Sequence, residues 1–246
     1  MTSPSPTPAD RRAIVSGAAG GIGRAIVSAL RDAGAAVAGC DLPGTGADVE
    51  FDVRDRTAVH AGVADAIGAL GGGCDAVVAN AGVVDTIHRA ERFSEDAWRG
   101  DLDTNLSGAF YLAQAAFEAL AASGDGRVVV ISSVAAEIGL PGQVAYGASK
   151  AGLVGLARTL AGEWGPRGVR CNVVMPGMFA TPKVTAMPDG LKDRVARTIP
   201  LGRFGEPDEL AAVVSFLLSP AAAYLNGSVI RVDGGFGLSS GAMTSR

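Results

Sequence analysis

Tyr146 and Lys150 stand four residues apart in the stretch Tyr146-Gly147-Ala148-Ser149-Lys150, where a run with helical spacing of apolar residues begins. Residues four apart lie on one face of a helix, so the phenol and the ammonium are expected side by side. A free tyrosine has a pKa of about 10, and a positive charge about 4 Å away, at an effective dielectric of about 20, favours its phenolate by about 4 kcal/mol. Lys150 is therefore expected to lower the pKa of Tyr146 toward neutrality, which suits an acid/base catalyst. By itself, a Tyr four residues before a Lys is more often part of a solvated helix surface. The rest of the sequence is therefore needed to choose between this interpretation and a catalytic pair.

A glycine-rich turn, residues 16–23, follows one apolar run and opens another. Such glycines let backbone N–H groups approach a pyrophosphate at the positive end of a helix. The spacing differs from the G-x-G-x-x-G dinucleotide fingerprint. It fits G-x-x-x-G-x-G through Gly17, Gly21 and Gly23, and also G-x-x-G-x-x-G through Gly17, Gly20 and Gly23. A turn that is glycine-rich for structural reasons is the alternative.

Asp41 ends the second strand-like run, 18 residues after Gly23. An acidic residue at this point accepts hydrogen bonds from an adenosine ribose. The 2′-phosphate of NADP would meet this carboxylate with no Lys or Arg among residues 16–23 to compensate, at a cost of up to about 4 kcal/mol for like charges about 4 Å apart. NAD is therefore the expected cofactor. The alternative is that Asp41 only begins the turn at residues 42–44.

Strand-like and helix-like runs alternate along the whole chain, which predicts an α/β fold with a doubly wound parallel sheet and helices on both faces. We expect one domain over residues 11–246, after a flexible leader, residues 1–10, rich in Pro, Ser and Thr. The seven expected strands lie near 12–16, 35–40, 49–51, 75–79, 127–131, 169–174 and 228–232. The expected helices lie near 22–33, 55–69, 94–121, 145–164 and 206–218, with a weaker pattern near 189–198.

Further polar residues follow the other strands, at the edge where ligands bind in such sheets. Asp52 and Val53 come after the third strand and are placed to flank an adenine, and residues 80–82 (Asn80, Ala81, Gly82) close the fourth. Ser133 follows the fifth strand, where a serine either points into the cleft or simply ends the strand. Asn105 lies inside an expected helix, where asparagine is mildly unfavourable and is more often a polar surface residue.

Composition excludes several classes of function. The net charge is −4 and no basic run occurs, which disfavours nucleic acid and anionic membranes as partners. The three cysteines form no C-x-x-C, and the two histidines, His60 and His88, cannot build a usual metal site alone, so neither a disulfide framework nor a metal is expected. No apolar run reaches 18 residues, and Arg11-Arg12 precedes too short an apolar run for an export signal. A cytoplasmic location is the default expectation.

Together these residues resemble the short-chain dehydrogenase/reductase family over nearly the whole chain. The markers are Gly17-x-x-x-Gly21-Ile22-Gly23, Asn80-Ala81-Gly82, Asn105, Ser133, Tyr146-x-x-x-Lys150, Pro176-Gly177 and Asp233-Gly234-Gly235. Ser133 stands 13 residues before Tyr146, as in typical members, which selects Ser133 over Ser132. The resemblance also favours G-x-x-x-G-x-G, because the other spacing is typical of longer relatives that modify sugar nucleotides. Two positions depart from the family pattern: Ser16 replaces the usual Thr and keeps a hydroxyl, and Ala79 replaces an Asn.

The resemblance implies a role for each reactive residue. Tyr146 would exchange a proton with the substrate hydroxyl, Lys150 would lower its pKa and bind the nicotinamide ribose, and Ser133 would hold the substrate oxygen. Asn105 would anchor a water between Lys150 and solvent, and Thr181 would bind the carboxamide. The implied cofactor-binding residues are Ser16, Gly17, Gly21, Ile22, Gly23, Asp41, Asp52, Val53, Asn80, Ala81, Gly82, Tyr146, Lys150, Pro176, Gly177 and Thr181.

The implied activity is NAD-dependent interconversion of a secondary alcohol and a ketone on a small-molecule substrate. Residues 178–200 resemble the substrate loop of the family. A 3-oxoacyl-thioester reductase is the second interpretation, although Asp41 disfavours the versions that use NADPH and a carrier protein. A catalytically silent NAD-binding regulator is disfavoured because all four reactive positions are filled. Family habit and small residues on the expected helices, such as Ala115, Ala116, Ala151 and Gly155, predict a homotetramer.

Overall fold

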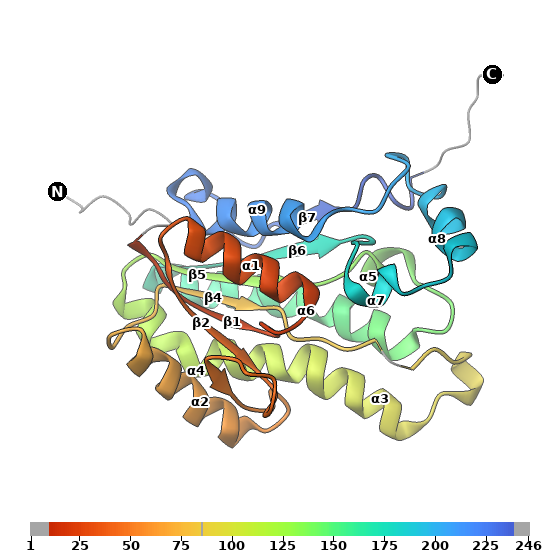
Figure 1. Ribbon diagram of the computed structural model, residues 1–246. Helices are drawn as coiled ribbons and strands as arrows, with labels where there is room; N and C mark the ends of the chain where they lie inside the picture. The colour runs from red at the N-terminus through yellow and green to blue at the C-terminus, as the bar shows by residue number, and fades with distance from the viewer. Residues whose placement is uncertain (1–9, 85, 239–246) are drawn as a thin grey trace.

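The computed structural model describes residues 10–84 and 86–238, and seven parallel strands form one sheet in the order β3-β2-β1-β4-β5-β6-β7 (Figure 1). The predicted single-domain, doubly wound parallel sheet is confirmed. Of the expected leader, residues 1–10, all but Asp10 lie outside the described residues. The strands are β1 (Arg12–Ser16), β2 (Ala36–Asp41), β3 (Val49–Glu50), β4 (Ala76–Ala79), β5 (Gly126–Ile131), β6 (Val169–Pro176) and β7 (Val229–Val232).

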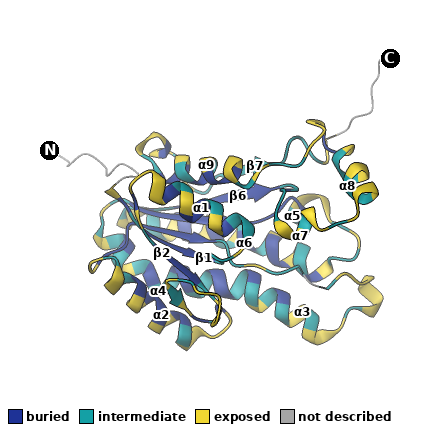
Figure 2. Ribbon diagram, viewed as in Figure 1, coloured by how far each residue is buried: buried dark blue, intermediate teal, exposed yellow. Residues whose placement is uncertain are grey.

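Helices cover both faces of this sheet (Figure 1). On one face α1 (Gly21–Asp32) and α9 (Pro207–Leu218) bury Ile26 and Leu210 against Val15 of β1. On the other face α2 (Arg56–Ala69), α4 (Gly108–Ala122) and α6 (Val144–Trp164) bury Leu112 and Leu153 against Ile14. Figure 2 shows the buried strands between the two layers. Because both faces are covered, β4 and β5 are buried at every position, which explains their nearly continuous apolar sequences.

The order of the strands reverses at β1, which pairs with β2 on one side and with β4 on the other. Chain segments leaving the carboxyl ends of these two strands diverge and leave a crevice between them, where ligands bind in open parallel sheets. The glycine turn follows β1, Asp41 ends β2 and Asn80 follows β4. The fold therefore brings the predicted cofactor residues to one edge.

The expected helix over 94–121 is interrupted. It is observed as α3 (Glu95–Leu102), a π-helical segment η3 (Asp103–Ser107) and α4. Ser94 caps α3 by accepting a hydrogen bond from the N–H of Ala97 at 3.2 Å. Asn105 lies in the π-helical segment and is fully buried. Such segments are rare and often mark functional sites, so Asn105 is a buried residue and not the polar surface position that was its alternative.

The segment expected as a substrate loop carries two short helices, α7 (Pro182–Thr185) and α8 (Asp189–Ala196), and α8 accounts for the weak helical pattern near 189–198. The remaining short helices are η2 (Ala90–Arg92), α5 (Ala135–Ile138), η4 (Gly165–Arg167) and η5 (Pro220–Ala222). In the part of the chain that the structure describes, none of the helices combines the length and apolarity that crossing a membrane requires.

Candidate functional site

A cleft of about 1050 Å³ opens at the carboxyl edge of the sheet, beside the point where the strand order reverses. Its walls come from the glycine turn, the segments that follow β2, β3 and β4, the inner face of α3 and the start of α7. The predicted cofactor residues that line it are Gly17, Gly21, Ile22, Gly23, Asp41, Asp52, Val53, Asn80, Ala81, Gly82 and Thr181. The predicted residues that do not line it are Ser16, Asn105, Ser133, Tyr146, Lys150, Pro176 and Gly177.

The glycine turn distinguishes the two possible spacings. Gly17 adopts a φ of 68°, and a Cβ there would lie 2.8 Å from the Cα of Ala81. A Cβ on Gly23 would lie 1.9 Å from the carbonyl oxygen of Gly17, and one on Gly21 would lie 2.9 Å from Cδ of Pro182. A Cβ on Gly20 would meet nothing closer than 3.4 Å. The turn therefore requires glycine at the positions of G-x-x-x-G-x-G, and its closely approached backbone forms a cradle that fits a dinucleotide pyrophosphate.

This difference predicts different effects for two alanine substitutions in the same turn. Gly23→Ala is expected to weaken NADH binding by about tenfold or more, because the methyl group displaces the Gly17 carbonyl. Gly20→Ala should leave the dissociation constant within about threefold of the wild-type value. Fluorescence titration of both variants with NADH, with circular dichroism to check folding, measures the effect. Equal losses in the two variants would contradict the assignment of the spacing.

Ser16 acts from behind the cleft wall. Its Oγ accepts hydrogen bonds from the backbone N–H groups of Asn80 and Ala81, both at 3.1 Å. Asn80 returns two bonds from Nδ2, to the carbonyl oxygens of Ser16 at 3.0 Å and Gly17 at 3.1 Å. These four bonds fix the glycine turn to the end of β4. The serine hydroxyl thus has a clear structural use at this position, whereas Ala79, which stands where an Asn was expected, is a core residue of β4.

Asp41 lies on the cleft wall with its carboxylate facing the glycine turn. Oδ2 accepts the N–H of Ala19 at 2.8 Å, and Oδ1 accepts the N–H of Leu42 at 2.7 Å. Asp41 therefore shapes the turn that follows it, as the alternative interpretation held. Each carboxylate oxygen has a second acceptor site, so this structural use leaves capacity for ribose hydroxyls. Asp52 is paired with Arg54 at 2.6 Å, and this pairing lowers the pKa of Asp52.

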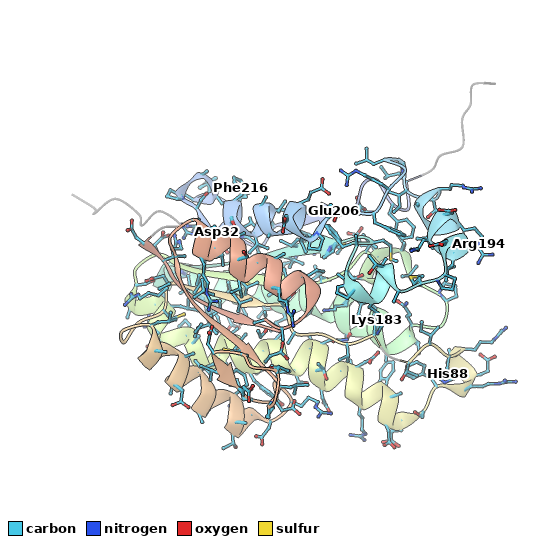
Figure 3. The ribbon with its side chains drawn as sticks, viewed as in Figure 1. Asp32, His88, Lys183, Arg194, Glu206 and Phe216 are labelled. Atoms are coloured by element: carbon cyan, nitrogen blue, oxygen red, sulfur yellow. The ribbon has the colours of Figure 1, made fainter. Side chains whose placement is uncertain are left out.

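Pro176 and Gly177 do not line the cleft but lie at the end of β6, in the segment that leads to Thr181. A Cβ on Gly177 would lie 2.8 Å from Cα of Asp233, so two of the sequence markers, Pro176-Gly177 and Asp233-Gly234-Gly235, pack directly against each other. The chain then continues to Thr181, which lines the cleft and precedes α7. Figure 3 shows Lys183 on α7. Its Nζ donates a hydrogen bond to the carbonyl oxygen of Val84 at 3.1 Å, which joins the 178–200 loop to the segment after β4.

Tyr146 and Lys150 lie in the first two turns of α6, and Ser133 follows the end of β5. Nζ of Lys150 lies 5.7 Å from the centroid of the Tyr146 ring and donates to the carbonyl oxygen of Ile131 at 2.9 Å. The Ser133 side chain is hydrogen-bonded to that of Tyr146. The neighbouring Ser132 instead donates its Oγ–H to the main-chain oxygen of Lys150 at 2.7 Å. The structure therefore brings together the serine, tyrosine and lysine that the sequence selected.

Burial moves the pKa of both members of the pair. It raises the pKa of Tyr146, more than the hydrogen bond with Ser133 lowers it, and it lowers the pKa of Lys150 to about 8. The expectation that Lys150 brings the pKa of Tyr146 toward neutrality is wrong in this structure. Loss of hydration penalises the phenolate, and Lys150 gives up its own charge near pH 8, before the phenol ionises.

The Asn105 side chain is fully engaged with neighbouring groups. Its Oδ1 accepts the N–H of Val83 at 2.7 Å, and its Nδ2 donates to the Val83 carbonyl at 3.0 Å and to Oγ of Ser149 at 3.1 Å. Ser149 in turn donates to the main-chain oxygen of Tyr146 at 2.8 Å. Asn105 therefore holds the segment after β4 against the helix that carries the tyrosine. The expected water between Asn105 and Lys150 stays a prediction.

Gly82 lies where the buried groups converge. A Cβ on this residue would sit 3.0 Å from Nζ of Lys150 and 3.1 Å from Oδ1 of Asn105. The lysine ammonium and the asparagine amide therefore share one small space beneath the cleft wall. No group of three His, Cys, Asp or Glu side chains suited to a metal ion occurs in residues 10–84 and 86–238.

The family assignment rests on most of the chain. A family model described as enoyl-(acyl carrier protein) reductase matches residues 17–237. The chain belongs to the short-chain dehydrogenase/reductase family. It is 41% identical to D-threitol dehydrogenase of Mycolicibacterium smegmatis, over 91% of this chain and 92% of that protein. It is 38% identical to (3R)-3-hydroxyacyl-CoA dehydrogenase of Mus musculus, over 91% and 95% of the two chains.

Solved structures of the family agree with the fold. The crystal structure of a short-chain dehydrogenase/reductase, glucose/ribitol dehydrogenase, from Brucella melitensis superposes with a TM-score of 0.84 at 31% identity and covers 93% of this chain and 97% of that one. These relatives are oxidoreductases of alcohol and carbonyl groups by name. This dehydrogenase/reductase is accordingly an oxidoreductase of the same family.

Two residues of the site were not found from the sequence. Ser149 lies inside the Tyr146–Lys150 stretch, where its spacing gives no sign that it meets Asn105. Asp101 is buried and lines the cleft from α3, one turn before Asn105. The only sign of Asp101 in the sequence was its position, four residues before Asn105 in the expected helix. Because aspartate on a helix is usually exposed, this position did not indicate that Asp101 belongs to the site.

Proposed function

We propose that this protein interconverts a secondary alcohol and a ketone with NAD(H). The observation that carries the proposal is the hydrogen-bonded pair of Ser133 and Tyr146 above the buried Lys150, at the edge of a cleft whose glycine turn fits a dinucleotide. The relatives with the names D-threitol dehydrogenase and (3R)-3-hydroxyacyl-CoA dehydrogenase support it. Both names describe oxidation of an alcohol.

In the proposed reaction, each residue of the site has a role that follows from its position. When bound, the nicotinamide cofactor supplies the hydride donor or acceptor. Tyr146 gives its hydroxyl proton to the ketone oxygen in reduction, or takes the alcohol proton in oxidation. Ser133, bonded to the tyrosine, orients the same substrate oxygen. Lys150 lies beneath the tyrosine ring and holds the exchangeable positive charge, and Asn105 fixes the surrounding segments.

The cofactor is held by the residues on the cleft wall. The backbone of Gly17, Gly21 and Gly23 is open to the pyrophosphate, and Asp41 accepts the adenosine ribose hydroxyls through its remaining acceptor sites. Asp52 and Val53, which follow β3 and line the cleft, would hold the adenine end of the cofactor. Thr181, which also lines the cleft, would bind the carboxamide. The carboxylate of Asp41 makes NAD(H) the preferred cofactor over NADP(H).

A screen for NADH formation at 340 nm tests this function. The substrates are cyclic and aryl secondary alcohols, polyols such as D-threitol, and (3R)-3-hydroxyacyl thioesters, each with NAD⁺. Turnover of at least one class, lost in Tyr146→Phe, is the expected result. The thioester arm tests the second candidate, a 3-oxoacyl-thioester reductase, which the 38% identity to the hydroxyacyl-CoA enzyme favours. Failure of every class in both directions would overturn the proposal.

The pKa of Lys150 predicts how turnover depends on pH. Its value of about 8 means that the ammonium is protonated below that pH and neutral above it. Alcohol oxidation needs the Tyr–Lys pair to have lost a proton, so kcat for oxidation should rise as the pH passes through about 8. Ketone reduction needs the proton and should fall over the same interval. Measurement of kcat in both directions from about pH 6 to 10 checks the sign, and two flat profiles would contradict it.

We propose further that the protein is a homotetramer. Of the small residues on the predicted helices, Ala116 faces the protein's own core, whereas Ala151 and Gly155 are exposed on α6. A Cβ on Gly155 would meet nothing within 4 Å, so this face permits close approach of a second helix and suits a closed symmetric assembly. Light scattering at micromolar concentration is expected to give four times the chain mass of 24.6 kDa. A single species at the chain mass would contradict the assembly.

A further inference from the structure

Arg231 on β7 ties together segments that lie far apart in the sequence. Its Nη1 donates to Oε2 of Glu137 on α5 at 2.8 Å, and its Nε donates to Oδ2 of Asp233 at 2.9 Å. Its Nη2 donates to the carbonyl oxygen of Phe236 at 2.6 Å. The side chain of Glu137 is 45% exposed, so this ion pair by itself would contribute little to stability. A guanidinium held by three partners has one orientation, however, and it fixes the Glu137 carboxylate in turn.

The helix that carries Glu137 also sets the orientation of the reactive serine. Oγ of Ser133 accepts the N–H of Ala135 at 3.2 Å, and the carbonyl oxygen of Ser133 accepts the N–H of Ala136 at 3.0 Å. A serine hydroxyl has two acceptor sites and a single hydrogen to donate. Because the backbone of α5 occupies one acceptor site, a movement of α5 changes the direction in which the Ser133 hydroxyl faces Tyr146 and the substrate oxygen.

The position of α5 depends on its neighbours. It has four residues, and helices this short are not stable alone in water. At its start the N–H of Val134 donates to the carbonyl oxygen of Pro176 at 2.9 Å. At its end Ile138 packs against Gly237, where a Cβ would lie 3.1 Å from Cγ2 of the isoleucine. The ion pair between β7 and α5 adds a polar anchor at this second end.

Arg231 is itself anchored to the segment behind the site. Its partner Asp233 is 10% exposed and belongs to one of the sequence markers. Cα of Asp233 would lie 2.8 Å from a Cβ on Gly177, and Oδ1 of Asp233 accepts the N–H of Gly235 at 3.0 Å. The contacts therefore form a connected series from the end of β6, through Asp233 and Arg231, to α5 and the reactive serine.

We propose that Arg231 and Glu137 are positioning residues for the reaction, and that their ion pair holds α5 so that the Ser133 hydroxyl faces the substrate oxygen. The proposal rests on the alcohol and ketone chemistry proposed above. Neither residue lines the cleft, so their effect on the reaction is indirect. Glu137 acts on Ser133 through the backbone of α5, and Arg231 acts through Glu137. Loss of the pair should therefore slow the step in which the substrate oxygen reacts and leave cofactor binding intact.

The kinetic test compares Glu137→Ala with Glu118→Ala, which makes the same change in an ion pair at the amino end of the sheet, where Glu118 of α4 binds Arg167 of η4 at 3.4 Å. Alanine favours a helix, so neither change weakens its helix through propensity. Glu137→Ala is expected to lower kcat about fivefold or more, because a small displacement of a positioned group slows the reaction. The dissociation constant for NADH should stay within about twofold of the wild-type value. Glu118→Ala should match the wild type in both measurements.

Two further variants show whether the effect passes through the serine. Glu137→Gln keeps an acceptor oxygen for Arg231 and should recover part of the lost turnover. In a double-mutant cycle, Glu137→Ala should lower kcat in the wild-type background and have no further effect in Ser133→Ala. Equal losses in the two backgrounds would show that Glu137 does not act through Ser133 and would overturn the proposal, as would a wild-type kcat in Glu137→Ala.

A last measurement needs no turnover. Hydrogen exchange followed by mass spectrometry reports the opening of backbone hydrogen bonds, including those within residues 133–138. In Glu137→Ala, and in Arg231→Lys, which cannot bind three partners in one plane, peptides that cover these residues should exchange faster than in the wild type. Peptides from α4 should not change. Unchanged exchange over residues 133–138 in both variants would overturn the proposal. A protein that oxidises no alcohol would overturn the proposed function instead, and the exchange rates would still decide whether the ion pair holds α5.

Discussion

Tyr146→Phe is expected to reduce turnover by about 10²–10⁴, the usual contribution of a positioned general acid or base. The substitution removes one oxygen and keeps the ring that lies over Nζ of Lys150 at 5.7 Å. Ser133 would then hold a substrate oxygen with no proton donor beside it. Because Tyr146 does not line the dinucleotide cleft, the dissociation constant for NADH should change little. Both kcat and NADH affinity are measured on the same preparation.

Tyr224→Phe is the matched control, since Tyr224 is fully exposed and does not line the cleft. It should leave kcat at the wild-type value. If Tyr146→Phe retains more than about a tenth of wild-type turnover, Tyr146 is not the acid/base group. If turnover and NADH binding are lost together, the substitution has disturbed the fold or the cofactor site, and the Lys150→Met and Ser133→Ala variants then decide whether the three residues act as a unit.

The fold was predictable because its signals are local. Every strand but the two-residue β3 is an apolar run, and each helix carries its own buried stripe, so alternation alone specifies a parallel sheet with two covered faces. The placement of Asp41 and Asn80 at one edge follows from that topology without any knowledge of side chains. The requirement for Gly17, Gly21 and Gly23 follows from close contacts of the turn with itself, with the segment after β4 and with the side chains of Thr181 and Pro182, and the spacing had already suggested it.

The energetics of the reactive pair were not predictable in the same way. The four-residue spacing of Tyr146 and Lys150 gives their proximity, but the sign of a pKa change depends on how much water the fold removes. Loss of hydration is the largest effect on the pKa of both residues, and it raises the pKa of Tyr146 and lowers that of Lys150. The burial of Asp101 was hidden for the same reason, because it arises where α3 packs against α6 and not from its sequence neighbours. A helical period cannot distinguish the inner face of a helix that contains a π-helical segment from its outer face.

Cofactor choice is expected to favour NAD(H) over NADP(H) by at least about 100-fold in kcat/KM, corresponding to roughly 3 kcal/mol of repulsion between Asp41 and the 2′-phosphate. The double substitution Asp41→Ala with Leu42→Arg should shift this ratio toward NADP(H) by about tenfold or more, because it removes the repulsion and adds a bidentate phosphate partner. The ratio is measured with both cofactors at one ionic strength. If both cofactors weaken together and the ratio stays fixed, Asp41 serves only the turn.

The structure allows a sharper version of this experiment, because Asp41 also binds the N–H groups of Ala19 and Leu42. Asp41→Asn keeps an acceptor oxygen for the turn and removes the charge, so it should raise kcat/KM for NADP(H) with a smaller loss for NAD(H) than Asp41→Ala. One cation competes with this interpretation: Arg24 lines the cleft and donates to the Ala19 carbonyl at 2.8 Å. If Arg24 neutralised a 2′-phosphate, Arg24→Gln would deepen the wild-type preference for NAD(H). If the charge of Asp41 dominates, Arg24→Gln should leave the ratio of kcat/KM for NAD(H) to that for NADP(H) within about threefold of the wild-type value, whereas Asp41→Asn should lower it. That pair of results would show that cofactor choice is set by repulsion from the Asp41 carboxylate and not by attraction to the Arg24 guanidinium.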